Sequence, residues 1–327
     1  MPKKIVAVAM GGYASEFEIS LLSGAVVCES LDTSKYEVYA IHILKTGWHY
    51  VATDGTKHEV NKADFSFSNG RETLVPDVIF NTIHGTPGED GYLQAYWKLL
   101  SIPQTSSDFY QAALSFNKRD CLSVLQHFGI KCANSYYVNK GGEIHLEEIV
   151  KKVGLPCFVK PNRSGSSFGV SKVHDMEDLL PAIEMAFTED SEIIIETALI
   201  GTEVSVGVYK NGAEAVVLPV TEIVSENDFF DYEAKYLGKS QEITPARISE
   251  KETELVQAEA KRIYGLLNMA GITRSEFIIQ EGEPFFLEIN TNPGLSKESI
   301  IPKQAREAGM TLTQFFGILV DNALTKN

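Results

Sequence analysis

The stretch GITRSEFIIQEGEPFFLEINTNPG, residues 271–294, contains two apolar segments on either side of an EGE turn. This pattern predicts a β-hairpin. Side chains alternate along a strand, so Glu288 and Asn290 should face one side of the second strand and the intervening isoleucine the other. A carboxylate beside an amide oxygen is the donor set that Mg²⁺ or Mn²⁺ prefers. An isolated pair of this kind more often lies on a solvated edge, so its surroundings must decide.

The length of the hairpin loop decides which residues accompany Glu288 and Asn290. An odd number of loop residues would bring Arg274 and Glu276 onto the same face. Two carboxylates, an amide and a guanidinium are too polar to be buried without a ligand. A metal ion bridging phosphate oxygens would satisfy the acids, and Arg274 would hold an anion. An even number of loop residues would break this arrangement, and the sequence leaves both lengths open.

Length and charge limit the classes of protein to consider. The 327 residues suffice for about two or three domains, and 44% hydrophobic with 22% charged residues is typical of a soluble globular protein. The net charge of −15 argues against a general binder of nucleic acids or anionic membranes, which needs a large basic surface. A local positive pocket for a phosphate ligand remains compatible with this charge.

Cysteine spacing and hydropathy indicate the compartment. The four cysteines show no paired spacing, which suits free thiols in a reducing environment. No apolar stretch approaches the roughly 18 residues of a membrane span. The first apolar run ends in glycines too early for a signal peptide and favours a buried strand. We therefore expect a cytoplasmic protein.

The first hundred residues alternate strands with helices. Continuous apolar runs predict buried strands at 4–10, 36–44 and 76–84, and helical spacing predicts helices at 18–31 and 91–100. This order is typical of a doubly wound α/β domain with a parallel sheet. The polar stretch between the second and third strands, residues 52–72, is interpreted as an insertion or hairpin.

The pattern changes after residue 106. Helices are predicted at 118–129 and 146–154, followed by two strands joined by a glycine-serine loop within 155–173. A β-rich region begins near residue 192 and ends in the opening hairpin and a final helix. We expect three parts, with the limits 1–106, 107–195 and 196–327.

One candidate phosphate site lies in the glycine-serine loop. Lys160 precedes Gly165, Ser166, Ser167 and Gly169. Small residues let backbone N–H groups surround phosphate oxygens, and the lysine adds a point charge. The lysine precedes the glycines, so this is not a Walker A loop. A plain hairpin tip is the more common alternative for such a segment.

Four further segments are candidates. His84 ends a predicted parallel strand, where α/β sheets bind ligands, although a lone histidine more often has a structural role. Glu16 follows a strand and two glycines, near the positive end of a helix, although helix capping explains it equally well. The linker from Glu196 to Glu203 could offer backbone groups to adenine and a carboxylate to ribose, or be a surface loop. The aromatic and acidic segment 228–240 resembles a lid loop.

Together these segments resemble the D-alanine–D-alanine ligases of the ATP-grasp superfamily. The resemblance runs from the first strand to the last helix, through five motifs in order: G-G-x-x-x-E-x-x-x-S, H-G-x-x-G-E-D-G, K-P-x-x-x-G-S-S-x-G, Y-E-A-K-Y and E-x-N-T-x-P-G. It implies an α/β fold, in which an N-terminal doubly wound domain precedes a two-layer α+β ATP-grasp pair. It also implies ATP-dependent joining of two D-alanines through an acyl phosphate, for peptidoglycan precursor synthesis.

The resemblance also implies roles for individual residues. The expected ATP contacts are Lys118, Lys160, Ser167, Glu196, Leu199, Glu203, Phe229 and Lys235. The expected ligands of two Mg²⁺ or Mn²⁺ ions, bound with ATP, are Glu276, Glu288 and Asn290. The expected D-alanine contacts are Glu16, His84, Ser299 and Ile300. The expected catalytic set is Glu16, Ser166, Tyr236, Arg274 and Gly294, in which the last two stabilise the oxyanion and the first three latch the lid.

The chain departs from the family in one position, because relatives usually carry aspartate where it has Glu276. The resemblance implies ATP and D-alanine as partners, a homodimer, and neither nucleic acid nor membrane binding. A ligase that uses D-lactate or D-serine as second substrate, or another ATP-grasp carboxylate–amine ligase, is the alternative. An ATP-binding regulator without turnover is a further one, although it would have no need of an oxyanion arginine.

Overall fold

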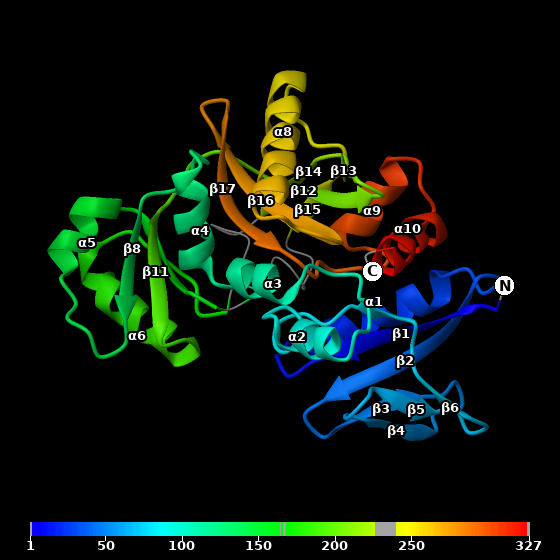
Figure 1. Cartoon of the computed structure of the whole chain (residues 1–327). Coiled ribbons are helices and arrows are strands. Elements are labelled where there is room, and N and C mark those ends of the chain that lie inside the picture. Colours follow the sequence, from blue (N-terminus) through cyan, green and yellow to red (C-terminus); the bar gives the residue numbers. More distant parts are fainter. Residues whose placement is uncertain (1, 164, 166–167, 226–239, 326–327) are drawn as a thin grey trace.

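The computed structural model describes residues 2–163, 165, 168–225 and 240–325. In the figure the chain forms three parts that meet in the middle of the molecule (Figure 1). The N-terminal part contains β1 (Lys4–Gly11), α1 (Phe17–Ser30), β2 (Tyr36–Leu44), β3 (Gly47–Val51), β4 (Lys57–Asn61), β5 (Ser66–Ser68), β6 (Thr73–Leu74), β7 (Val78–Asn81) and α2 (Tyr92–Leu99).

The N-terminal sheet is parallel only around β1. Its strand order is β6-β5-β4-β3-β2-β1-β7, and β1 pairs in parallel with both β2 and β7. The expected parallel arrangement is therefore confirmed for these three strands. From β2 to β6 the pairing is antiparallel, because short turns join each strand directly to its neighbour. This antiparallel extension contains the stretch 52–72, in agreement with the hairpin interpretation.

Strand β1 is covered on both faces, as a doubly wound sheet requires. Val6 and Val8 belong to one apolar core with α1 and with the last helix, α10 (Leu312–Leu324). Ala7 and Ala9 belong to a second core, which contains Trp97 of α2. The apolar run predicted from the sequence is continuous because both sides of the strand are buried.

The central part is a small antiparallel sheet covered by two helices. It comprises β8 (Ser135–Asn139), α5 (Leu146–Val153), β9 (Cys157–Pro161), β10 (Ser171–Val173), the 3₁₀ turn η1 (Met176–Asp178), α6 (Leu179–Glu189) and β11 (Glu192–Thr197). The strand order is β10-β9-β11-β8. Ile149 of α5 and Ile183 of α6 are fully buried against the sheet. Lys160 is the second-last residue of β9.

The C-terminal part is a larger sheet with the order β15-β14-β12-β16-β17, to which β13 adds by pairing with β12. Its strands are β12 (Thr202–Asn211), β13 (Glu214–Val217), β14 (Thr221–Ser225), β15 (Ser240–Ile243), β16 (Ile272–Gln280) and β17 (Glu283–Asn290). Its helices are α8 (Glu250–Leu266), α9 (Ile300–Glu307) and α10. Helix α8 lies along the sheet, with Ile263 fully buried in the core (Figure 1).

In two places, a helix from one of the three predicted parts packs into the core of another part. Helices α3 (Phe109–Phe116) and α4 (Lys118–His127) precede the central sheet, but Leu125 of α4 lies in the core of the C-terminal sheet. At the other end, Phe316 of α10 packs edge-on against Phe80 of the N-terminal sheet, with ring centroids 5.6 Å apart. These helices tie the three parts together around a common centre. Among the described residues, no helix is both long and apolar enough to cross a membrane.

The β16–β17 hairpin contains a β-bulge that the sequence pattern does not predict. Its loop is the two residues Glu281 and Gly282, both with positive φ, so the number of loop residues is even. Phe277 accordingly lies opposite Phe286, but beyond this pair the register shifts at a β-bulge. Glu276 then lies opposite Glu288. The expectation that an even loop would break the cluster is wrong, because the bulge adds one residue and restores the shared face.

Candidate active site

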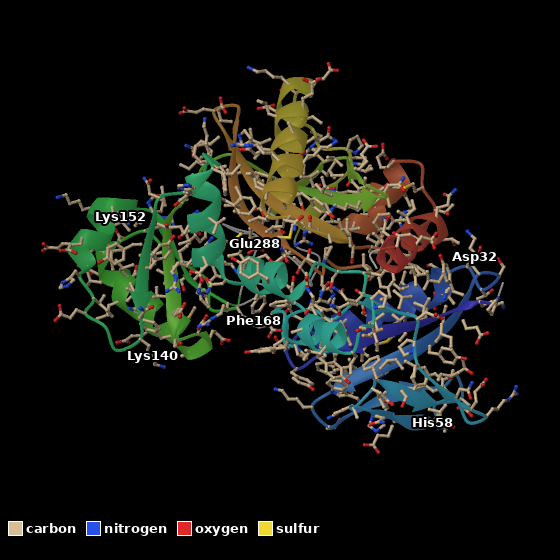
Figure 2. The ribbon with its side chains drawn as sticks, in the orientation of Figure 1. Asp32, His58, Lys140, Lys152, Phe168 and Glu288 are labelled. Carbon is tan, nitrogen blue, oxygen red and sulfur yellow. The ribbon has the colours of Figure 1, made fainter. Side chains whose placement is uncertain are left out.

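A cavity of about 300 Å³ lies where the three parts meet. Figure 2 shows Glu288 in the middle of the molecule, between the central part and the C-terminal sheet. The residues that line this cavity include nine of the predicted site residues: Glu16, His84, Lys118, Arg274, Glu288, Asn290, Gly294, Ser299 and Ile300. The structure therefore brings residues from the first strand-helix turn, the hairpin and the start of α9 to one place.

The hairpin face is the most strongly charged wall of the cavity. Arg274 Nη2 lies 2.5 Å from Glu276 Oε1, and both side chains are largely buried. Glu288 Oε2 lies 3.4 Å from Lys118 Nζ at the start of α4. Burial opposes the charge of Arg274, but the carboxylates of Glu276 and Glu288 outweigh it and raise the pKa of the guanidinium. Arginine thus stays cationic beside a carboxylate pair.

Two buried nitrogen atoms on this face lack partners among the described residues. They are Arg274 Nε and Asn290 Nδ2. An unpaired buried donor costs about 1–3 kcal/mol, so native sites of this kind usually pair with a ligand or water. The hairpin face is therefore built to receive a polar molecule.

The donor set also suits a divalent cation. Glu276, Glu288 and Asn290 offer two carboxylates and an amide oxygen, the hard oxygen ligands of Mg²⁺ and Mn²⁺. No group of three His, Cys, Asp or Glu side chains in the described part of the chain makes a metal site by itself. The three residues fit a metal that takes its remaining oxygens from a bound phosphate group, which is how Mg²⁺ commonly binds.

A second ion pair lies in the central sheet. Lys160 Nζ on β9 is 2.5 Å from Glu196 Oε2 on the neighbouring strand β11, and Glu196 is buried. Burial would lower the pKa of Lys160, but Glu196, then Glu288 and Glu203, outweigh it and raise this pKa. The influence of Glu288 links this pair to the hairpin face. Half-buried Leu199 follows β11, and half-buried Glu203 lies on β12.

His84 is buried at the N-terminal wall of the cavity. Its Nδ1 lies 2.7 Å from the carbonyl oxygen of Asn292, so Nδ1 donates a hydrogen bond and the ring is in its Nδ1–H form. Its Nε2 lies 3.4 Å from the hydroxyl of Ser23. Burial lowers the pKa of His84 despite the opposing effect of Glu16. The imidazole is therefore neutral near pH 7 and connects the N-terminal part to the segment after β17.

Glu16 immediately precedes α1, but its side chain forms no capping hydrogen bond there, so helix capping does not explain it. Its carboxylate instead approaches Gly165 of the glycine-serine loop. A Cβ atom on Gly165 would lie 3.0 Å from both carboxylate oxygens, so a larger residue there would push the carboxylate aside. The contact joins the N-terminal and central parts across the cavity.

The start of α9 forms another part of the cavity wall. Ser299 occupies the N-cap position without a side-chain capping bond, and its hydroxyl lies 2.7 Å from that of Ser296. Ile300 is buried. A Cβ atom on Gly294 would meet the Ser299 hydroxyl at 2.9 Å, so glycine keeps its backbone close to this helix terminus. A helix N-terminus favours an anionic group.

Sequence reasoning missed three acidic residues of the cavity: Glu89, Glu242 and Glu298. Glu89 accepts a hydrogen bond from the Gly85 N–H at 3.0 Å, and burial followed by repulsion from Glu16 raises its pKa to about 7. Its position within H-G-x-x-G-E-D-G was the available signal. Glu242 of β15 also lines the cavity, and no motif indicated it. Ser166, Ser167, Phe229, Lys235 and Tyr236 lie outside the described residues.

An α/β domain followed by two β-rich layers, with Lys160 on one layer and an acidic hairpin on the other, defines an ATP-grasp fold. Family models agree with this class. The model described as D-ala D-ala ligase N-terminus matches residues 5–107, and the model described as D-ala D-ala ligase C-terminus matches residues 124–321. The chain belongs to the D-alanine–D-alanine ligase family, which confirms the family expected from its motifs.

Individual relatives agree along the whole chain. The D-alanine–D-alanine ligase of Flavobacterium johnsoniae is 58% identical over 321 residues, covering 98% of this chain and 99% of the relative. That of Christiangramia forsetii is 56% identical over 324 residues, covering 99% of each.

Solved structures share the fold. The VanG D-Ala:D-Ser ligase from Enterococcus faecalis superimposes with a TM-score of 0.89 at 31% identity, covering 98% of this chain and 100% of that one. The D-alanine–D-alanine ligase from Bacillus anthracis complexed with ATP has a TM-score of 0.79 at 25% identity, covering 98% and 97%.

Proposed function

We propose that this chain joins two molecules of D-alanine into D-alanyl-D-alanine, converting ATP to ADP and phosphate, as a step in peptidoglycan precursor synthesis. The observation that carries this function is the hairpin face, where Arg274 and Asn290 keep unused hydrogen-bonding groups inside a cavity shared with Glu16 and the start of α9. Family membership over the whole chain supports the same activity.

The first step activates a carboxylate, which is by itself a poor electrophile. A carboxylate oxygen of the first D-alanine attacks the γ-phosphorus of ATP, and ADP leaves, giving an acyl phosphate. Two Mg²⁺ or Mn²⁺ ions bound with ATP, held by Glu276, Glu288 and Asn290, would neutralise phosphate charge. We assign Lys118 and Lys160 to phosphate contacts, because both are cations beside this face.

The second step forms the peptide bond. The neutral amine of the second D-alanine attacks the acyl carbon, and the carbonyl oxygen becomes an oxyanion. We assign Arg274 and the backbone N–H of Gly294 to its stabilisation, since both border the cavity. Collapse of this intermediate expels phosphate, and the amine loses its proton to leave the amide.

Substrate contacts follow from charge. Glu16 would accept the ammonium group of the first D-alanine, with neutral His84 beside it. Ser299 and Ile300, at the positive end of α9, would receive the carboxylate of the second. Glu196, Leu199 and Glu203 are proposed to border the adenosine, as the motifs imply.

The remaining assignments rest on the motifs alone. We assign Ser167, Phe229 and Lys235 to ATP, and Ser166 and Tyr236, with Glu16, to holding a lid closed over the acyl phosphate. Such a lid would exclude water from a reactive intermediate. Comparing hydrogen exchange in residues 225–243 with and without ATP and a phosphinate analogue tests this assignment, and equal protection in both states would contradict it.

A D-serine acceptor is the second candidate, because a solved D-Ala:D-Ser ligase is 31% identical to this chain, against 26% for a D-alanyl-alanine synthetase with the same TM-score of 0.89. D-lactate is a third. The deciding experiment incubates the protein with ATP, magnesium and D-alanine, and then with equal concentrations of D-alanine, D-serine and D-lactate. We expect phosphate release and mainly D-alanyl-D-alanine. A mixed product in which D-serine dominates would replace the proposed acceptor, and no phosphate release would reject the ligase.

We also propose a cytoplasmic homodimer built from domains with the limits 1–106, 107–195 and 196–327. Helices α2 and α3 support the dimer, because they expose large apolar side chains: Tyr92, Leu99, Phe109 and Tyr110. Tyr92 and Leu99 are seven residues apart and share one face of α2. Sedimentation of a Leu99→Glu variant tests this surface: a monomer is expected, and an unchanged dimer would place the interface elsewhere.

A further inference from the structure

The wall of the cavity beside α9 contains an acid that no motif predicts. Glu242 on β15 lies directly opposite Ile223 on β14. Residues directly opposite each other in an antiparallel pair share a face. Ile223 in turn packs against Ile300, the first residue of α9. The register and this apolar contact together bring Glu242 beside the start of α9, where the second substrate is proposed to bind.

Lys303 lies one turn further along the same helix and faces two acids. Its Nζ is 3.3 Å from Glu242 Oε2 and 3.9 Å from Glu298 Oε2. Both carboxylates line the cavity, whereas the lysine does not. The Lys303 and Glu242 side chains are 29% and 20% exposed, so the closer pair is only partly screened by solvent. Lys303 therefore pairs closely with Glu242 and only weakly with Glu298, whose side chain is 87% exposed.

Resting on the proposed ligation, we propose that Lys303 is a positioning residue for the acceptor amino acid, acting through Glu242 and Glu298. The N-terminus of α9 attracts the acceptor carboxylate. Without Lys303, the Glu242 carboxylate would repel the same group, and the more exposed Glu298 would add a weaker repulsion. Glu242, held in place by the lysine, attracts the ammonium of an approaching D-amino acid, which a D-hydroxy acid lacks.

The test is a Lys303→Met variant, which keeps the length of the side chain and removes its charge. We expect the KM of the acceptor D-alanine to rise about three- to fivefold, the range that a partly exposed ion pair allows. The KM values of ATP and of the first D-alanine should change less than twofold, because the lysine is outside their proposed contacts. The two D-alanine constants are separated by fitting the rate against D-alanine concentration to two sequential sites.

Two further variants separate charge from structure. Lys303→Arg should restore the acceptor KM. Lys303→Met combined with Glu242→Gln should bring it part of the way back, because the repulsion of the acceptor carboxylate by Glu242 is gone but its attraction for the acceptor ammonium is lost as well. The double variant should also lower the preference for D-alanine over D-lactate. A uniform change in kcat and every KM, or no recovery in either variant, would mean that Lys303 only stabilises the local structure. Either result would overturn the inference.

Lys297→Met is the matched control. Lys297 pairs with Glu29 at 3.3 Å, both side chains are 65% exposed, and neither lines the cavity. Its removal should leave the acceptor KM unchanged. A normally active wild-type protein with an unchanged acceptor KM in Lys303→Met would overturn this inference alone. A wild-type protein that makes no dipeptide would overturn the proposed function and the inference with it.

Discussion

The β9–β11 pair of the central sheet and the β16–β17 pair of the C-terminal sheet place charged groups in the middle of the molecule in different ways. Strands β9 and β11 keep a regular antiparallel register, and the Lys160–Glu196 ion pair spans the two strands. Strands β16 and β17 contain a bulge, and the Arg274–Glu276 pair lies along one strand. Both ion pairs measure 2.5 Å and are largely buried.

The two strand pairs differ in how many buried polar atoms they leave without a hydrogen-bond partner. Lys160 and Glu196 have no buried side-chain nitrogen or oxygen without a partner among the described residues, whereas the hairpin face leaves Arg274 Nε and Asn290 Nδ2 without one. A regular ladder lets alternate side chains meet and satisfy each other. A bulge turns polar groups onto a face where their neighbours cannot satisfy all of them. The central pair holds a charge in place, while the hairpin presents groups for a ligand.

Breaking the hairpin face should have the largest effect. Glu288→Gln keeps the shape of the side chain but removes a ligand charge, so turnover should fall more than about 1,000-fold. Phosphate release measures this, and an unchanged melting temperature checks the fold. Glu283→Gln, at the exposed end of the same strand and paired with Lys131, is the control and should retain activity. Normal ligation by Glu288→Gln would remove the metal assignment.

The bulge has two effects: it pairs Glu288 with Glu276, and it bends the strand. Removing the bulge tests the second effect alone. Deleting Leu287 would make the ladder regular and still leave Glu288 opposite Glu276, but the local bend of the strand would be lost. A displacement of about 1 Å in such a site costs about 100-fold in rate, so we expect a loss of that order. The kcat of the deletion variant measures it. Full activity would mean that the site needs Glu288 and Glu276 on the same face of the hairpin but does not need the bend of the strand.

Breaking the central pair should affect stability more than the chemical step. Lys160→Met leaves Glu196 buried without its cation, which should cost about 3 kcal/mol of unfolding free energy. Loss of a proposed phosphate contact should also weaken ATP binding by about tenfold. Urea unfolding and nucleotide titration measure the two effects. Wild-type stability in this variant would show that Glu196 finds another partner.

Glu89 is a third, partly buried acid near the cavity. Unlike Glu196 and Glu276, it forms no ion pair among the described residues. Its pKa rises from 4.5 to about 7 on folding, mainly through burial. The folded state then holds the proton more tightly than the unfolded chain, so the free energy of unfolding falls as pH rises from about 4.5 to about 7.

Glu89→Gln should remove this dependence and be more stable than the wild type by about 1 kcal/mol at pH 8. Thermal unfolding of both proteins between pH 5 and pH 8 measures the difference. Parallel stability curves would contradict the raised pKa.

The smallest effect is expected at Glu276. Replacement by aspartate, the residue that the motif resemblance leads us to expect here, keeps the charge and shortens the side chain by one methylene. Turnover should stay within about threefold of the wild-type value or improve. Steady-state kinetics with magnesium and with manganese check this. A complete loss would mean that the longer side chain is required by a rearranged site.

Local patterns indicated the fold class and most of the candidate site residues. Apolar runs located the parallel strands because both faces of β1 are buried. His84 could be placed at a strand end, and Glu16 near a helix end, because those positions depend on neighbouring residues. Glu89 was present in a recognised motif but carried no distinguishing pattern. Glu242 could not be found, since it reaches the cavity only through its register with Ile223.

The sequence by itself determined the order of strands and helices, the hairpin, and the residue types from which a phosphate and metal site is made. Only the tertiary structure decided that Glu276 and Glu288 face each other, because an even loop and a bulge together set the register. It also decided that Lys303 on α9 forms an ion pair with Glu242 on β15. Alternation and helical spacing act over a few residues and are visible in the chain, whereas register and packing depend on segments that meet only after folding.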